Sequence, residues 1–153
     1  MLFLHSRGWC DGTGGNFSVC LQHDPLQLLM APSGVDKGSV QAEELIVVDA
    51  NGAVTDGNGR ASAETELHLC IMSSVGAGAV LHTHSVAATV LSRVHGCDGF
   101  VQLEGWEMLK GLNGIKSHET TLALPVVANN QDMKQLSASV KPHLHGPAWG
   151  ILV

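Results

Sequence analysis

The chain has 153 residues, of which 44% are hydrophobic, enough for one globular domain over residues 1–153 with a substantial core. A formal charge of −6 argues against binding to nucleic acid or to an anionic membrane surface. Aromatic residues are only 4% of the chain and Tyr is absent, so a base-stacking platform is not expected.

The four cysteines form no Cys-x-x-Cys pair, which argues against a thiolate zinc site. The sequence contains neither a secretory leader nor the run of about 18 apolar residues that a membrane helix needs. These observations predict a cytoplasmic protein with reduced thiols and no membrane partner.

The N-terminal residues predict a helix end followed by a glycine-rich turn. Residues 1–9 resemble the last part of a helix that Gly8 stops, and the turn at residues 11–15 leads into a strand that carries Asn16 and Ser18. Backbone N–H groups converge in such turns and can bind an anion. A plain glycine turn before a strand is the alternative.

A second polar turn follows the apolar strand predicted at residues 26–30. It contains Ser33 and Gly34, with a lysine close behind, and is another possible anion cradle. The alternative is a loop in which Ser39 caps a short helix ending at Glu44. Strands at 45–49 and through residue 54, joined by an Asn-Gly turn, complete a hairpin.

Two histidines are the focus of the middle of the chain. Ser62 and Glu64 open a helix predicted over residues 64–73, with Glu64 in its first turn. A strand then ends in His82-Thr83-His84, whose alternate side chains share one face, so the two imidazoles can grip one metal ion. Two ordinary half-buried histidines are the alternative. Ser85 is suited to cap a helix at 86–94.

The last third alternates short strands and helices. Glu107 lies in a helical turn ended by Gly111 and, taken alone, could be an ordinary solvated acid. The remaining predictions are strands at 100–103, 122–127 and 149–153, a helix at 133–140 and a loop at 142–147. The mixture favours a mixed or antiparallel sheet with helices packed on it.

Six of these segments, in this order, resemble the class II aldolase family, the zinc-dependent fuculose-phosphate aldolase type. They are RGWCDGTGGNFSV (7–19), APSGVDKG (31–38), SAETELH (62–68), GAVLHTHS (78–85), EGWEMLKG (104–111) and LPVVANNQDM (124–133). Within the family the pattern is most similar to the branch that dehydrates a ketose 1-phosphate in methionine salvage.

The resemblance implies an α/β fold of three layers, α/β/α, around a central, mainly antiparallel sheet, and a homotetramer with sites near subunit interfaces. It also implies one Zn²⁺ per subunit, with His82 and His84 as ligands, Glu107 as the catalytic acid/base and Glu64 as an acid near the metal. The residues implied around the substrate phosphate are Asn16, Ser18, Ser33, Gly34 and Ser62.

The resemblance has one departure. The family's third zinc ligand is a histidine in a motif that follows a strand similar to residues 149–153, where this sequence ends. His145 and the residues up to Gly150 imitate that motif but precede the strand. We therefore expect that the start of the first helix, the third-ligand motif and the last helix are missing, and that zinc occupancy and activity are reduced.

Three functions follow as expectations. The first is a zinc-dependent lyase that dehydrates a sugar phosphate. The second is an aldolase or epimerase of the same family. The third is a catalytically impaired, truncated relative that serves as a non-enzymatic subunit.

Overall fold

The structure is a computed structural model that describes residues 1–145 and 150–153. Its elements in chain order are α1 (Leu2–Ser6), β1 (Asn16–His23), β2 (Leu26–Met30), the 3₁₀ turn η1 (Ala42–Glu44), β3 (Ile46–Asp49), β4 (Val54–Asp56), α2 (Thr65–Val75), β5 (Ala79–His82), α3 (Val86–Val94), β6 (Phe100–Leu103), the 3₁₀ turn η2 (Glu107–Gly111), β7 (Leu122–Pro125), α4 (Met133–Val140) and the 3₁₀ turn η3 (Lys141–His143).

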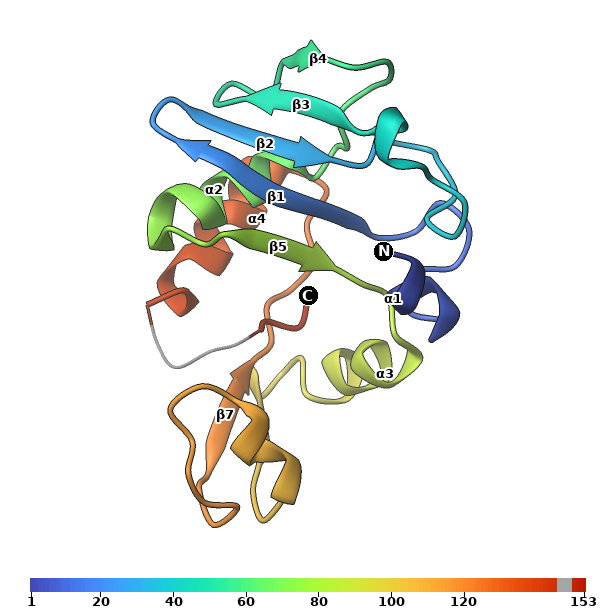
Figure 1. The fold of residues 1–153 in the computed structure, drawn as a ribbon. Helices are drawn as coiled ribbons and strands as arrows, with labels where there is room; N and C mark the ends of the chain where they lie inside the picture. The colour runs from blue at the N-terminus through green and yellow to red at the C-terminus, as the bar shows by residue number, and fades with distance from the viewer. Residues whose placement is uncertain (146–149) are drawn as a thin grey trace.

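A five-stranded antiparallel sheet organises the molecule, with strand order β4-β3-β2-β1-β5 (Figure 1). Hairpin turns join β1 to β2 and β3 to β4, and the Asn-Gly signal predicts the second of these. Strand β5 instead arrives from α2 and pairs with the free edge of β1, with Asn16 opposite His82. This register brings the start of one strand to the end of another that lies 66 positions later.

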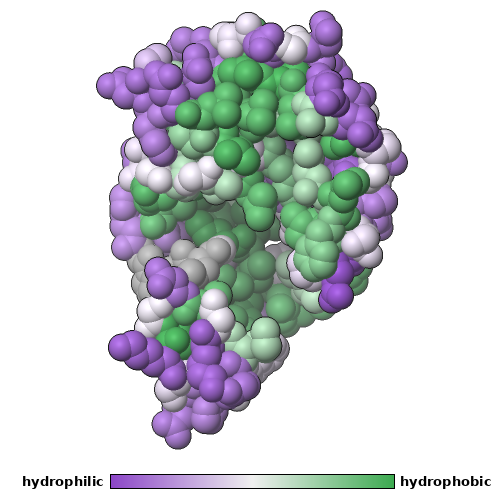
Figure 2. Space-filling model, in the orientation of Figure 1, coloured by the Kyte–Doolittle hydropathy of each residue, from purple (hydrophilic) through white to green (hydrophobic). Residues whose placement is uncertain are grey.

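Helix α2 packs on one face of this sheet, and α4 packs against α2 on the same side (Figure 1). Leu136 and Val140 of α4 are buried in an apolar cluster that Leu67 and Ile71 of α2 help to cover. The opposite face carries exposed apolar side chains of β1 and β5, namely Val19, Leu21 and Leu81, and Figure 2 shows an apolar surface over this part of the molecule. The α/β class and the mainly antiparallel sheet are confirmed, and the described residues form one helical layer.

A separate two-stranded sheet, β6 with β7, projects beyond α3 together with η2 (Figure 1). We call residues 100–125 the arm. Leu152 forms an isolated parallel bridge with Val126, just after the arm returns to the sheet.

The strong local signals predict elements well. The strand at 26–30 and the helices at 86–94 and 133–140 have the bounds expected from the sequence. Ser85 caps α3 by accepting a hydrogen bond from the Ala88 N–H, and Asp132 caps α4 in the same way. Side-chain acceptors placed before amphipathic segments thus fixed where these helices begin.

Four local predictions need correction. Gln41 rather than Ser39 caps η1, through a reciprocal pair of bonds with Glu44. Glu64 is the residue that precedes α2, not part of its first turn. The loop expected from residue 142 begins as the 3₁₀ turn η3, because Pro142 suits the start of a helical turn.

The strand expected at 149–153 is reduced to the single bridge at Leu152. Residue 149 lies outside the described residues, as does most of the imitation motif at 145–150. Across residues 1–145 and 150–153, no helix has both the length and the apolar character needed to cross a membrane.

Replacing Leu136 by Ala tests the packing of α4. Because this side chain is 2% exposed within the apolar cluster, Leu136→Ala is expected to lower the free energy of unfolding by about 2–5 kcal/mol. Urea denaturation followed by circular dichroism measures the change. Leu2→Ala, at an exposed position, is the matched control and should change it by less than about 0.5 kcal/mol. Equal effects at the two positions would contradict the packing described here.

Candidate active site

The glycine-rich turn before β1 lies directly against the end of β5. Gly15 has a φ of +71°, and a Cβ atom there would come within 2.6 Å of the His82 carbonyl oxygen. A side chain at Gly14 would approach the His84 ring at 3.6 Å. Gly15 therefore meets both a conformational and a steric requirement for glycine, and the turn can reach the two histidines.

His82 and His84 lie side by side. His82 is the last residue of β5, and His84 follows one residue after the strand ends. Their ring centroids are 4.6 Å apart and the ring planes are inclined by 39°. The His84 N–H donates to the Trp9 carbonyl at 2.7 Å, and Ser85 begins α3 immediately afterwards. The segment after α1 and the cap of α3 together hold the second histidine.

Glu64 links the loop before α2 to this histidine pair. His82 Nδ1 lies 2.9 Å from Glu64 Oε2, so the ring donates its Nδ1–H to the carboxylate. The Asn16 amide donates to the same carboxylate and, at 3.3 Å, to the Ser62 hydroxyl. The hydrogen bond from His82 is the main cause that lowers the pKa of Glu64 to about 2, against the opposing effect of burial.

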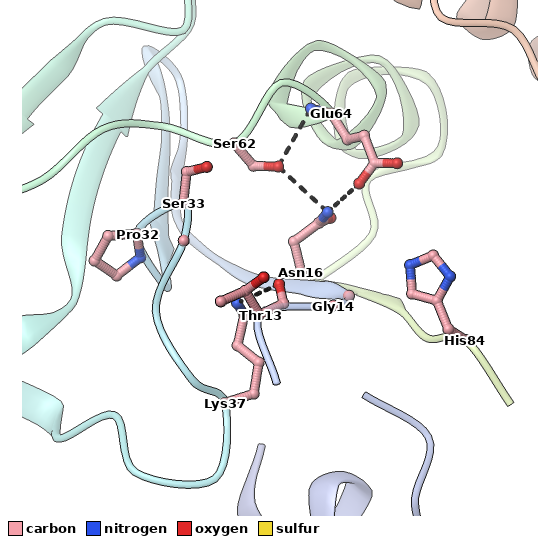
Figure 3. A pocket seen from close by; sticks show the side chains of 11 residues that line it. Thr13, Gly14, Asn16, Pro32, Ser33, Lys37, Ser62, Glu64 and His84 are labelled. Carbon is pink, nitrogen blue, oxygen red and sulfur yellow. Dashed lines mark hydrogen bonds between the residues drawn. The ribbon is translucent and has the colours of Figure 1, made fainter. Parts of the chain in front are cut away.

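A polar cavity of about 200 Å³ opens beside these groups (Figure 3). It lies where the two polar turns, the loop before α2 and the end of β5 converge. The residues that line it are Thr13, Gly14, Gly15, Asn16, Pro32, Ser33, Gly34, Lys37, Ser62, Glu64 and His84. The cavity thus brings together most of the residues that the sequence singled out, from segments up to about 70 positions apart.

Ser18 does not line this cavity. Its side chain points from β1 toward α2, is 1% exposed, and shares a hydrogen bond of 2.6 Å with His68 Nδ1. The expectation of a phosphate-loop position for Ser18 is corrected: it shares a strand face with Asn16, but two residues farther along the strand it lies beneath the helix.

His68 lies next to the site, and no sequence pattern predicted a role for it. It lies in α2, is 1% exposed, and its Nε2 has no partner in the described part of the chain. Burial lowers the pKa of His68 to about 4, and the neighbouring His82 lowers it further. Its place on the same helix side as Leu67 and Ile71 could have indicated burial, but not the bond to Ser18.

Glu107 lies far from this network, on η2 in the arm (Figure 1). Its side chain is 69% exposed, is ion-paired with Lys110, and approaches His118 Nδ1 at 3.6 Å. It is not among the residues that line the cavity. The local sequence correctly predicted a helical turn at Glu107, but it could not predict where that turn lies relative to the histidines.

The donor set at the end of β5 suits a zinc ion. Burial, followed by the charge of His82, lowers the pKa of His84, which favours the neutral imidazole that binds metals. The carboxylate on His82 Nδ1 leaves Nε2 as its ligating atom, an arrangement common around ligating histidines. Over the described ranges, no group of three or more His, Cys, Asp or Glu side chains is poised around one point. The pair alone therefore offers two nitrogen donors to one metal ion.

These features are those of a polar small-molecule pocket beside a histidine pair, built at the junction of a sheet and a helix. The chain belongs to the class II aldolase and adducin N-terminal domain family, whose model matches residues 1–153. Two relatives of this chain are both named for the same reaction. The chain is 42% identical to a methylthioribulose-1-phosphate dehydratase of Sorangium cellulosum, over 99% of this chain and 72% of that protein.

A second relative of the same name, from Pectobacterium carotovorum, is 45% identical over 99% of this chain and 74% of its own length. Among solved structures, YgbL from Escherichia coli, a candidate aldolase/epimerase/decarboxylase, has a TM-score of 0.76 at 25% identity, over 93% of this chain and 65% of that one. L-fuculose-1-phosphate aldolase from Thermus thermophilus shares the fold, with a TM-score of 0.64 at 24% identity over 92% of this chain.

The chain spans about two thirds of these solved proteins, 65% and 66% of their lengths. The relatives named as dehydratases are hydro-lyases by that name. The lyase class of the relatives and the α/β fold of the solved structures agree with the expectations from the sequence.

The buried His68 predicts a pH dependence of stability. Its pKa is lowered from 6.5 to about 4 on folding, so between these values the unfolded chain binds more protons at this residue than the folded protein. The free energy of unfolding should therefore fall as the pH decreases from about 6.5 to 4 and should be unaffected by this residue above that range. Urea titrations at a series of pH values measure the slope. His68→Gln cannot titrate and should lose this part of the slope; an unchanged slope in that variant would contradict the assignment.

Proposed function

We propose that this chain provides the active site of a zinc-dependent hydro-lyase that removes water from 5-methylthioribulose 1-phosphate and yields 2,3-diketo-5-methylthiopentyl 1-phosphate in methionine salvage. The observation that carries the proposal is the 42–45% identity, over 99% of the chain, to relatives named for this dehydration. The cavity supports it, because a polar pocket with two glycine turns lies beside two imidazoles.

His82 and His84 are the residues that would hold the metal. A bound zinc ion supplies a Lewis acid for the C2 carbonyl of the substrate. The substrate phosphate is assigned to the second turn, where Ser33 and Gly34 line the cavity.

Glu64 is proposed as the residue that positions His82. With a pKa of about 2 it is ionised at neutral pH and too weakly basic to be a strong proton acceptor. As a fixed carboxylate it orients the His82 ring and increases the electron density on Nε2. Asn16 and Ser62 hold Glu64 in turn, through the bonds drawn in Figure 3.

Glu107 is proposed as the acid that protonates the departing C4 hydroxyl, and a second copy of the chain is proposed to supply it. Within one chain Glu107 lies on the arm and outside the cavity. Its neighbours Trp106 and Met108 are 61% and 80% exposed, an apolar pair that contact with another subunit would cover. A homotetramer with sites near subunit interfaces meets this need.

The histidine pair gives the first test. His84→Ala should weaken zinc binding by more than about 100-fold, because the loss of a ligand costs more than the loss of its supporting bond. Zinc content after gel filtration and competition with a chromophoric chelator measure this. His23→Ala, on the exposed end of β1, is the matched control and should leave zinc binding unchanged. Equal zinc affinity in the two variants would remove His84 from the site.

Mixing two inactive variants tests the shared site. Glu107→Gln retains an intact histidine pair and His84→Ala retains an intact arm. Unfolding and refolding them together should restore about a quarter of the sites of the unaltered protein. Dehydration of 5-methylthioribulose 1-phosphate, followed by mass spectrometry of the product, gives the readout. No recovery in the mixture, with each variant folded and oligomeric, would show that Glu107 of one subunit does not act in the histidine site of another.

An aldolase or epimerase reaction is the competing function, favoured by the fold shared with YgbL and with L-fuculose-1-phosphate aldolase. The same product assay separates the two. Dehydration yields one product lighter by a molecule of water, whereas aldol cleavage releases two smaller fragments and epimerisation leaves the mass unchanged. A cytoplasmic location is proposed with the dehydration, since the described cysteines are all free thiols.

A further inference from the structure

Lys37 is a buried lysine on the wall of the cavity. It follows the turn of Ser33 and Gly34, its residue is 1% exposed, and it lines the cavity together with both of them. Lysine is rarely buried unless something compensates its charge. Its burial could not be predicted from the local sequence, since a lysine beside a glycine turn is usually solvated.

The Lys37 ammonium holds the two polar turns together. Its Nζ donates to the Thr13 carbonyl at 3.2 Å and to the Val35 carbonyl at 2.9 Å, and its backbone N–H donates to the Gly12 carbonyl at 3.2 Å. Figure 3 shows the side chain running from the second turn to Thr13 in the first. An ammonium group has three N–H donors, so these two carbonyls leave one donor for another partner.

Among the residues that the structure describes, no carboxylate forms an ion pair with this ammonium group. In the part of the chain that the structure describes, no Asp or Glu oxygen lies within 4.0 Å of Lys37 Nζ. The adjacent Asp36 is directed elsewhere, toward His5 and the Gly38 N–H. The cavity therefore contains a buried cation whose compensating anion is not provided by these residues, and burial lowers the pKa of the Lys37 amine accordingly.

The remaining charge of the cavity favours the same conclusion. Glu64 is ionised there, and the whole chain has a charge of −6. A dianionic phosphate would be repelled by this field unless a cation lay close to it. Of the described residues that line the cavity, Lys37 is the one lysine or arginine.

We propose that Lys37 is the cationic ligand of the phosphate group in this cavity: its third N–H donates to a phosphate oxygen while the other two fix the Thr13 and Val35 carbonyls, so that both turns present their backbone N–H groups to the same anion. The assignment rests on the proposed function in so far as the anion is the phosphate of a sugar phosphate. It determines specificity, because an uncharged sugar would leave the Lys37 charge uncompensated.

Binding of inorganic phosphate to the zinc-free chain tests the proposal without any catalysis. Isothermal titration at constant ionic strength should give a dissociation constant at least about tenfold higher for Lys37→Met than for the unaltered chain. Lys116→Met, an exposed lysine on the arm, is the matched control and should bind phosphate as the unaltered chain does. Zinc affinity of Lys37→Met, read through the histidines of the same cavity, should be unchanged and shows that the site is still folded.

A second measurement separates direct contact from a structural role and needs no variant. In the unaltered chain labelled with ¹³Cε-lysine, saturation with phosphate should shift the Lys37 resonance more than any other lysine resonance. The proposal is overturned if the chain binds no phosphate, if Lys37→Met binds it equally well, or if phosphate binds without moving the Lys37 resonance. Should Lys37→Met fail to fold, the resonance alone decides.

The two proposals fail separately. Phosphate binding that depends on Lys37, in a protein that does not dehydrate 5-methylthioribulose 1-phosphate, would retain the anion site and reject the proposed reaction. Dehydration of that substrate, with phosphate binding indifferent to Lys37, would retain the reaction and reject the role of Lys37.

Discussion

The contact between Gly15 and the His82 carbonyl is the constraint on which the site depends. A Cβ atom at residue 15 would lie 2.6 Å from that oxygen, so the first turn can meet the end of β5 only because no side chain is there. This contact, and the pairing of β1 with β5, set Asn16 opposite His82. Any residue larger than glycine would push the turn away from the histidines and open the polar network between them.

Around that contact, each polar group is held by a group from another segment. Asn16 comes from β1, Ser62 and Glu64 from the loop before α2, and the imidazoles from the end of β5. The low pKa of Glu64 and the lowered pKa of His84 arise from this assembly rather than from either residue alone. The charge state of the site is thus a property of the tertiary fold.

Sequence patterns predicted elements whose signals are local. The cap at Ser85 and the Asn51-Gly52 hairpin are each specified by a few neighbouring residues, and the structure contains both. The closeness of His82 to His84 also followed from spacing alone. The resemblance to a known family supplied the roles, which no local pattern could have given.

Properties that depend on packing were not predictable in this way. Ser18 shares a strand face with Asn16, but the helix above it converts a candidate ligand into a partner of His68. The burial of Lys37 depends on two turns meeting, which neither turn encodes by itself. The helical turn at Glu107 was predicted from local sequence. Its position away from the histidines depends on the course of the arm, which is a long-range feature and could not be predicted in this way.

The short connection between β5 and α3 couples the position of α3 to the geometry of the histidine pair. His82 moves with the sheet, whereas His84 precedes the cap at Ser85 and so follows α3, with its N–H bonded to Trp9. Tilting α3 against the sheet would therefore change the distance between the two imidazole rings, and with it their ability to bind one ion together. Because α3 leads into the arm, a displacement of the arm that tilts α3 would change the distance between the two imidazole rings.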